Sequence, residues 1–198
     1  MLVTPSAERM RGVQPWRRLF HAGNGLVVAF FPPVLGLEKR VLLLILSSLL
    51  VVLLAFDLVR LRVPGVNAFF FKAFPSLASP REAKQAASST WYACGVVIAY
   101  AFFPVRIAVP AIVVLALADP MASVVGRLWG RRRVGNGTVL GSLVFLFVAF
   151  AVLSAFFGPA AAMVPALVVT CVEVVPWRLD DNLTVVVAGA TALCLMGV

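Results

Sequence analysis

Residues 41–57 read VLLLILSSLLVVLLAFD, an apolar run interrupted only by Ser47 and Ser48 before it ends at an acid. A transmembrane helix needs about 20 mostly apolar residues, fewer when it packs beside others, so this run predicts a membrane-spanning helix. The whole chain has the same character, because 62% of its 198 residues are hydrophobic and 13% are charged. Ordinary soluble domains have about 45–50% and about 25%. A globule of this size exposes too much surface to hide so many apolar side chains, which excludes a water-soluble enzyme.

Further apolar runs lie on both sides of this one. A shorter patch at 66–74 contains Phe69-Phe70-Phe71 followed by Lys72, and we expect it to lie at the membrane surface as an amphipathic segment. Residues 1–18 are polar and basic and form an N-terminal tail. We therefore predict an all-α, polytopic integral membrane protein with about seven transmembrane helices. The candidate spans are 20–37, 41–57, 88–103, 105–119, 138–157, 160–176 and 183–198.

The basic residues predict the orientation of these spans. The net charge is +9, with 17 Lys and Arg against 8 Asp and Glu. In so apolar a chain this excess indicates loops that face membrane lipid headgroups or a phosphorylated substrate, and no nucleic-acid partner is expected. With the N-terminus in the cytoplasm, only Lys39, Arg40 and Arg106 of the 17 basic residues fall outside. This bias follows the positive-inside rule and predicts that the C-terminus lies on the other side.

Six acids fall at or near the predicted cytoplasmic ends of the spans. Carboxylates at membrane depth are costly and usually mark function. Acids that meet a basic surface are what a metal–phosphate site needs. A transporter would place its acids near the middle of the membrane, so a non-enzymatic transporter or scaffold is the weaker alternative. The six acids are Asp57, Glu82, Asp119, Glu173, Asp180 and Asp181.

The segment ADPMASVVGRLWG at 118–130 is the most informative motif. Asp119, Ser123 and Arg127 follow one another at i, i+4 and i+8 and would share a helix face. An acid for Mg²⁺, an arginine for phosphate and a glycine-bearing loop with backbone N–H groups would then converge. Alternatively, Asp119 caps a helix that begins at Pro120. The candidate phosphate-binding residues are Arg127, Arg131, Arg132, Arg133, Gly135, Gly137, Thr138, Gly141 and Ser142.

A second segment, EVVPWRLDDNLT at 173–184, carries further oxygen ligands. Asp180, Asp181 and Asn182 could hold a divalent cation. Alternatively, Asp181 or Asn182 caps the last helix. Glu173 lies within an apolar run, where helix capping gives no explanation for an acid.

The order of the motifs resembles that of the polyprenol kinase family, which includes dolichol kinase, phytol kinase and CTP-dependent diacylglycerol kinase. The resemblance covers about residues 17 to 190, and its most specific parts are the Asp119 segment and the segment Asp181-Asn182-Leu183. The matching motifs are RxxxHxxxG at Arg17, His21 and Gly25, DxxR at Asp57 and Arg60, Arg81-Glu82, DPxAxxxGRxxG from Asp119, TxxGS from Thr138 to Ser142, Glu173, and DNLT from Asp181 to Thr184.

The resemblance implies a catalytic domain at 19–198 that transfers the terminal phosphate of a nucleoside triphosphate, typically CTP, to a membrane lipid alcohol. The acceptor would be a polyprenol, a phytol-like isoprenoid or diacylglycerol, and the active site would face the cytoplasm. Arg17 and Arg60 would join the phosphate-binding residues. The implied Mg²⁺ ligands are Asp119, Asp180, Asp181 and Asn182, and the implied catalytic residues are Asp119, Glu173, Asp57 and His21.

The chain departs from the family pattern at two positions. Gly137 stands where the family has a lysine, and Leu140 stands where it has an acid. The Asp119 segment is also similar, more distantly, to phosphatidate cytidylyltransferase. A cytidylyltransferase is therefore the second enzymatic alternative, although the C-terminal signature of that enzyme is absent from this chain.

The proton of the lipid hydroxyl needs an acceptor. His21 has a suitable ordinary pKa, and a carboxylate such as Asp57 or Glu173 is the other choice. We slightly favour a carboxylate at this stage, because Mg²⁺ and several arginines would disfavour an imidazolium.

Overall fold

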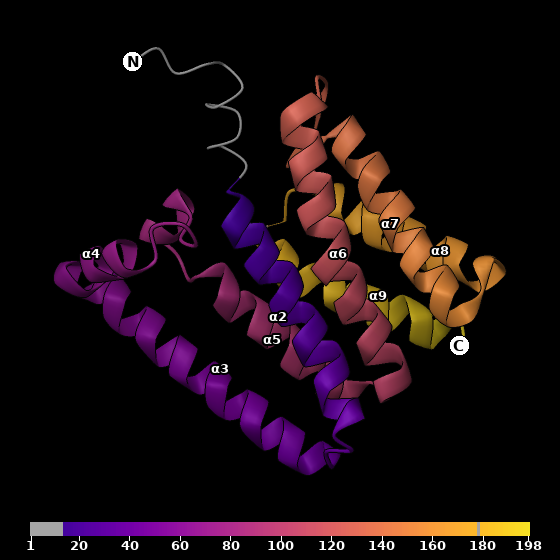
Figure 1. The fold of residues 1–198 in the computed structure, drawn as a ribbon, viewed down its shortest axis with the longest axis horizontal. Helices are drawn as coiled ribbons and strands as arrows, with labels where there is room; N and C mark the ends of the chain where they lie inside the picture. Colours follow the sequence, from indigo (N-terminus) through magenta and orange to yellow (C-terminus); the bar gives the residue numbers. More distant parts are fainter. Residues whose placement is uncertain (1–13, 178) are drawn as a thin grey trace.

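The computed structural model describes residues 14–177 and 179–198, in which α-helices predominate (Figure 1). Residues 1–13 and 178 lie outside the described residues. They include Arg9, Arg11 and Arg178, which are among the basic residues that the sequence predicts to face the cytoplasm. In chain order, the elements are α2 (Pro15–Val34), α3 (Lys39–Arg62), α4 (Pro64–Ala73), the 3-10 helix η1 (Pro80–Ala83), α5 (Ser88–Phe102), α6 (Val105–Trp129), β1 (Arg133–Val134), β2 (Gly137–Thr138), α7 (Val139–Phe157), α8 (Pro159–Val174) and α9 (Asp181–Leu195).

The helices confirm the predicted all-α membrane class. Helices α2, α3 and α5 to α9 occupy the predicted apolar runs, and α4 covers most of the patch at 66–74. Within the described residues, α3, α6 and α7 are long and apolar enough to cross a membrane, whereas α8 and α9 are apolar but shorter. Helices α5 and α9 have 15 residues and α8 has 16. At 1.5 Å per residue they extend roughly 22–24 Å, less than the ~30 Å hydrocarbon layer. The number of seven spans therefore stays a prediction.

Helix α6 corrects one of the sequence interpretations. It runs without a break from Val105 to Trp129 with Pro120 inside it, so Asp119 is not the cap of a new helix. Pro120 has no N–H for the carbonyl one turn earlier, but the side-chain packing around α6 holds the helix together across that gap. Since the helix continues, Asp119, Ser123 and Arg127 remain on one face, as their spacing predicts.

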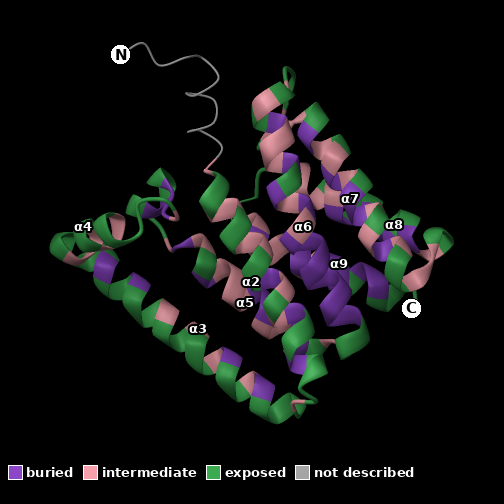
Figure 2. Ribbon diagram, viewed as in Figure 1, coloured by how far each residue is buried: buried purple, intermediate pink, exposed green. Residues whose placement is uncertain are grey.

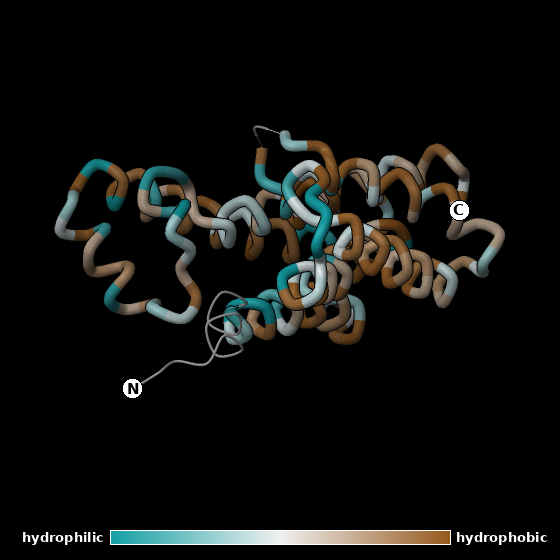
Figure 3. The backbone as a smooth tube through the Cα atoms, turned by 90° about the horizontal axis from the view of Figure 1, so that it is seen from above, coloured by the Kyte–Doolittle hydropathy of each residue, from teal (hydrophilic) through white to brown (hydrophobic). Residues whose placement is uncertain are grey.

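The centre of the molecule is formed by α6, which packs against α2, α7 and α9. Its side chains Ile112 and Leu115 are fully buried, together with Tyr100 of α5 and Phe145 of α7. Figure 2 shows this buried centre and the contrasting α3, whose residues are mostly exposed. Figure 3 shows that hydrophobic residues nevertheless predominate along the helices. Apolar side chains that face outward in this way fit a lipid environment.

Successive long helices run in opposite directions. Helix ends that are far apart in the sequence therefore meet at one end of the bundle, and the predicted site residues lie there. The N-termini of α2, α5, α7 and α9 lie near the C-termini of α3, α6 and α8 (Figure 1). The positions of the acids near these ends agree with the sequence interpretation. Which side of a membrane this end faces stays a prediction.

Candidate active site

A large cavity of about 1220 Å³ occupies this end of the bundle. All six acids that the sequence predicts to meet there line it, so their expected convergence is found. One part of the lining is polar and includes Arg17, Arg18, His21, Asp119 and Arg127. The other part is apolar, with Leu46, Leu49, Leu53 and Phe56 of α3 and Phe69, Phe70 and Phe74 from α4 and its C-cap.

Asp119 lies between two nitrogen-bearing side chains of α2. Its Oδ2 atom is 3.9 Å from Arg18 Nη1 and 3.9 Å from His21 Nε2. Both distances are longer than a hydrogen bond. The Asp119 side chain is 34% exposed, toward the cavity that it lines. It is therefore placed to interact with a ligand in the cavity.

His21 has one ring nitrogen engaged and the other without a partner. The backbone carbonyl of Leu115 accepts a hydrogen bond from the ring. Nε2 is buried and has no hydrogen-bond partner among the described residues, so the bond to Leu115 comes from Nδ1. A neutral ring that donates from Nδ1 carries its free lone pair on Nε2. His21 thus presents a proton acceptor close to Asp119.

The residues before α9 bring further carboxylates to the cavity. Asp180 caps α9, since its Oδ1 accepts hydrogen bonds from the Asn182 backbone N–H at 3.1 Å and from Asn182 Nδ2 at 2.6 Å. The cap is therefore Asp180, and the alternative that named Asp181 or Asn182 is wrong. Burial raises the pKa of Asp180, and these hydrogen bonds oppose the rise.

Asp181 is affected by the charges of the other acids in the cavity. Burial and then repulsion from Asp180, Asp119 and Glu173 raise the pKa of Asp181 to about 7. We call these four residues the carboxylate cluster. Mutual repulsion of this kind is what a bound cation would relieve. The cluster thus brings four carboxyl groups to the cavity.

The carboxylate cluster fits a magnesium ion that is shared with a substrate. No three His, Cys, Asp or Glu side chains of the described chain form a preformed cage for a metal. Mg²⁺ does not need one, because it is usually held by one or two carboxylates together with waters and substrate phosphates. Asp119 and Asp181 are suitable oxygen ligands. Asn182 uses its amide nitrogen to hold Asp180.

The glycine-rich segment after α6 forms a tight hairpin beside Glu173. Strands β1 and β2 pair Arg133 with Thr138, and Gly135 at the turn has φ +50°. A side chain at Gly135 would collide with the carbonyl of Val174, so only glycine allows this approach. Ser142 donates a hydrogen bond to Glu173 Oε2 at 3.3 Å. The hairpin therefore packs against the end of α8.

The candidate phosphate-binding residues divide into two groups. Those that line the cavity are Arg17, Arg127, Arg131, Arg133, Gly137, Thr138 and Gly141. The other described candidates, which do not line it, are Arg60, Arg132, Gly135 and Ser142. Gly135 and Ser142 lie behind the lining and support the hairpin and Glu173. Thr138 also caps α7 by accepting a hydrogen bond from the Gly141 N–H at 3.1 Å.

Asp57 and Arg60 form a buried polar latch. Arg60 is fully buried and donates to Asp57 Oδ1 at 2.6 Å, and to the carbonyls of Glu82 and Gln85 at 2.6 and 2.9 Å. Asp57 Oδ2 accepts from the Ala87 N–H at 2.9 Å and from Thr90 Oγ1 at 2.7 Å. Both Asp57 oxygens are thus engaged. This geometry supports a structural role that ties α3 to α5, rather than proton transfer by Asp57 or phosphate binding by Arg60.

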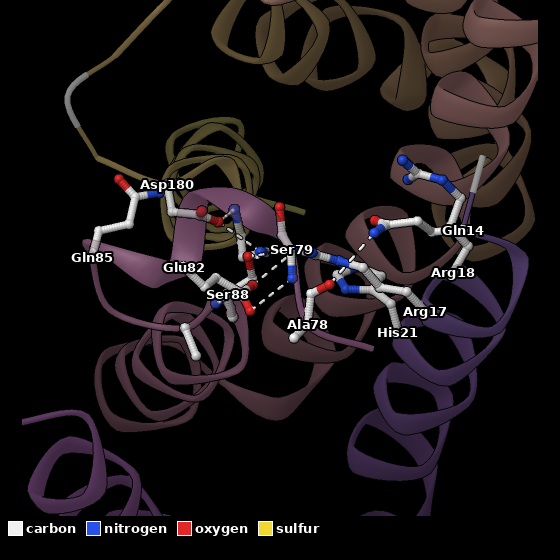
Figure 4. A network of polar contacts seen from close by, with 12 residues as sticks. Gln14, Arg17, Arg18, His21, Ala78, Ser79, Glu82, Gln85, Ser88 and Asp180 are labelled. Atoms are coloured by element: carbon white, nitrogen blue, oxygen red, sulfur yellow. Dashed lines mark hydrogen bonds and ion pairs between the residues drawn. The ribbon is translucent and has the colours of Figure 1, made fainter. Parts of the chain in front are cut away.

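Arg17 is engaged by the segment before α5. Its Nη2 atom lies 2.7 Å from Ser88 Oγ and 3.2 Å from Glu82 Oε1. Glu82 also accepts hydrogen bonds from the backbone N–H groups of Ser79 and Ser88 at 3.1 and 3.2 Å. Figure 4 shows Arg17 reaching from α2 into this network. Arg17 therefore contributes charge to the cavity while it also fixes α2 to η1 and α5.

Sequence reasoning missed Arg18 and Tyr92 as site residues. Arg18 is three positions before His21, and this spacing on a helix could have indicated that both face Asp119. Tyr92 lines the cavity with its hydroxyl buried. No motif or periodic pattern in the sequence indicates Tyr92, because its contact with His21 arises only where α5 meets α2 in the fold.

The cavity thus joins an apolar lining, which can take a lipid tail, to a lining of acidic and basic side chains, which can take a phosphorylated co-substrate. The similar proteins belong to the class of lipid kinases. The chain is 29% identical over 146 residues to CTP-dependent diacylglycerol kinase 1 of Eremothecium gossypii, a match that covers 72% of this chain and 45% of that protein. It is 23% identical over 145 residues to CTP-dependent diacylglycerol kinase 1 of Saccharomyces cerevisiae, with coverage of 72% and 50%.

These similarities confirm the predicted resemblance to CTP-dependent diacylglycerol kinases. The chain spans about half the length of the curated relatives that it matches. No protein-family model matches the chain, and no solved structure matches it.

Proposed function

We propose that this protein is a CTP-dependent lipid kinase that transfers the terminal phosphate of CTP to the hydroxyl of a membrane lipid alcohol. The observation that carries the proposal is that one cavity has both a polar lining, which suits a nucleotide phosphate, and an apolar lining, which suits a lipid tail. The names of the two relatives support CTP as the donor and diacylglycerol as one acceptor. Polyprenols and phytol-like isoprenoids share the same chemistry and stay within the proposal.

The donor phosphates would occupy the polar part of the cavity. Arg127, Arg131 and Arg133 line it beside the backbone of Gly137 and Thr138, and cations and N–H groups of this kind neutralise phosphate charge. Asp119 and Asp181 would hold Mg²⁺, which supplies charge neutralisation at the donor phosphates. The arginines can thereby take the place of the family lysine that Gly137 replaces.

The lipid would enter from the side, between α3 and the rest of the bundle. Leu46, Leu49, Leu53 and Phe56 recur at i, i+3, i+7 and i+10 along α3 and form one apolar stripe on the cavity. The opposite face of α3 is also apolar and exposed, with Val51 and Val52 both 63% accessible. A tail can therefore stay in hydrocarbon while its hydroxyl reaches the helix ends at the carboxylate cluster.

The chemical step moves one phosphoryl group and one proton. The lipid hydroxyl oxygen forms a bond to the γ-phosphorus as the bond from that phosphorus to the β–γ bridging oxygen breaks. The hydroxyl proton passes to His21 Nε2, giving the lipid phosphate and CDP. Both Asp57 oxygens are engaged in the latch, so the geometry favours His21 as base over Asp57.

The test is a transfer assay with the purified full-length chain, Mg²⁺ and γ-labelled CTP or ATP against a panel of dioleoylglycerol, phytol, farnesol and a polyprenol. The proposal expects label in the lipid and CDP as the second product. Release of pyrophosphate would instead identify a cytidylyltransferase. Absence of any labelled lipid with every donor and acceptor would overturn the proposal.

A further inference from the structure

Two side chains that each carry an unpartnered buried polar atom lie next to each other in the lining of the cavity. Four buried side-chain oxygen or nitrogen atoms of the described residues have no hydrogen-bond partner: His21 Nε2, Tyr92 OH, Ser154 Oγ and Thr184 Oγ1. Of these four residues, only His21 and Tyr92 line the cavity. Their rings meet edge to face, with centroids 4.8 Å apart and an interplanar angle of 75°. An unpaired buried polar group destabilises a fold, so two such side chains together on a cavity indicate a ligand.

The backbone of α2 leaves room for the Tyr92 hydroxyl. A Cβ atom at Gly25 would collide with Tyr92 OH and with the Cβ of Ala116. Ala116 lies on α6 one turn before Asp119. Glycine at this one position of α2 therefore allows the hydroxyl to reach the junction of α2, α5 and α6, close to the carboxylate cluster.

The chemistry of these two atoms fits a hydroxyl group. The Tyr92 O–H can donate a hydrogen bond, and Nε2 of a neutral His21 ring that is protonated on Nδ1 can accept one. A phosphate oxygen could accept from Tyr92 but could not donate to His21. An ammonium group could donate to His21 but has no lone pair for Tyr92. A hydroxyl group does both at once.

We propose that Tyr92 positions the hydroxyl of the lipid acceptor, donating to its oxygen while the acceptor O–H points to His21 Nε2. This inference rests on the proposed function and names a residue for it that no motif assigns. Val96, one turn further along α5, is buried and lines the same cavity. The first carbons of the acceptor would lie beside it, at the junction of the polar and apolar linings.

The test compares Y92F with the wild-type chain in mixed micelles of detergent and dioleoylglycerol, with CTP as donor. Loss of one hydrogen bond to the acceptor should lower kcat/KM for the lipid by about tenfold. The KM for CTP should change less than twofold, and the share of CTP that is hydrolysed by water should rise. Thermal stability should stay the same or increase, because the variant removes a hydroxyl that lacks a partner.

Y100F is the matched control on the same helix. The Tyr100 hydroxyl is buried and donates to the carbonyls of Val28 and Ala29 at 2.8 and 3.1 Å. Its removal leaves those carbonyls short of a donor, so Y100F should lower the unfolding temperature and leave the KM for the lipid unchanged. The two variants are thus expected to give opposite patterns.

Three results are decisive. An unchanged kcat/KM for dioleoylglycerol in Y92F overturns the role of Tyr92. A loss of stability in Y92F equal to that of Y100F, with both substrate KM values unchanged, assigns Tyr92 to packing and also overturns it. A wild-type chain that phosphorylates no lipid alcohol overturns the proposed function itself, before any variant is compared.

Discussion

His21 Nε2 and Asp119 Oδ2 face each other at 3.9 Å across the contact of α2 with α6. The distance is too long for a hydrogen bond, and both residues line the cavity. The proposed proton acceptor and the proposed metal ligand thus lie side by side in the lining of one cavity. The relative placement of α2 and α6 therefore sets the reaction geometry.

Asp119→Asn should lower phosphate transfer by orders of magnitude, because an amide cannot replace a carboxylate toward Mg²⁺. The fold should survive, since the contacts of Asp119 Oδ2 with Arg18 Nη1 and His21 Nε2 are both long, at 3.9 Å. Transfer rate and unfolding temperature are the two measurements. Glu38→Gln, at an exposed acid before α3, serves as the control. Near-normal turnover of the Asp119 variant would remove Asp119 from the metal site.

Arg127→Ala should raise the KM for CTP by about tenfold, as expected for a lost charge-assisted contact to phosphate, and leave the KM for the lipid nearly unchanged. The side chain is exposed and lines the cavity at the C-terminal end of α6. Steady-state kinetics with each substrate varied in turn would show this. Arg106→Ala, an exposed arginine at the opposite end of the same helix, should alter neither value. A selective change in the lipid KM would argue against a donor-side role for Arg127.

Asp181 predicts a dependence of stability on pH. Its pKa is about 7 in the folded chain and roughly 3.9 in an unfolded one, so folding favours the protonated form. Without divalent cations, the folded state should lose stability as pH rises from about 4 toward 7. Mg²⁺ binds the carboxylate, so its apparent affinity should fall as pH drops below 7.

Asp181→Asn tests this dependence directly. Unfolding temperatures at pH 5 and pH 8, with chelator and with Mg²⁺, should show a smaller difference in the variant than in the wild type. An identical pH slope in both proteins would show that another group titrates.

Arg60→Ala should destabilise the fold strongly. Removal of one partner from a buried ion pair costs on the order of 3–5 kcal/mol, and Asp57 would be left charged and 3% exposed. Denaturant unfolding in detergent would measure the change in free energy. Arg62→Ala, at an exposed position two residues later, should have little effect. A stable Arg60 variant with a raised KM for CTP would instead return Arg60 to the phosphate site.

Seven spans would place the two ends of the chain on opposite sides of the membrane. Reporter fusions at the N-terminus and after Val198 should therefore read as cytoplasmic and non-cytoplasmic, with the basic residues inside. Opposite readings at the two ends support an odd number of spans. A cytoplasmic reading at both ends would mean that one of the short helices α5, α8 or α9 does not cross.

Much of this fold could be predicted because apolar runs and their interruptions are local properties of the sequence. The positions of α3, α7 and α8 follow directly from them. The continuity of α6 through Pro120 could not be predicted, because a proline usually favours a helix boundary and only the surrounding packing overrides that preference. The cap at Asp180 was equally ambiguous, since Asp180, Asp181 and Asn182 are all good capping residues.

Part of the site could be predicted because charged residues are rare in an apolar chain and usually mark function there. Each of the six acids stood out for this reason, and all reach the cavity. Local spacing could not separate Asp57 from the others, however. The difference arises from its contacts with Ala87 and Thr90, which are distant in sequence. Tyr92 was missed for the same reason, because its place in the site depends on its contacts with His21 and Gly25 of another helix.

The buried Asp57–Arg60 latch holds α3 in place independently of the apolar stripe on that helix. Substitutions in the stripe and substitutions in the charged site therefore have separate effects. The stripe of Leu46, Leu49 and Leu53 lies at least one helical turn from the latch and contains no member of the carboxylate cluster. Substitutions there alter the width of the groove while the charged residues around Asp119 keep their places. Under the proposed function, changes in this stripe would therefore alter acceptor preference and leave the residues proposed for phosphoryl transfer in place.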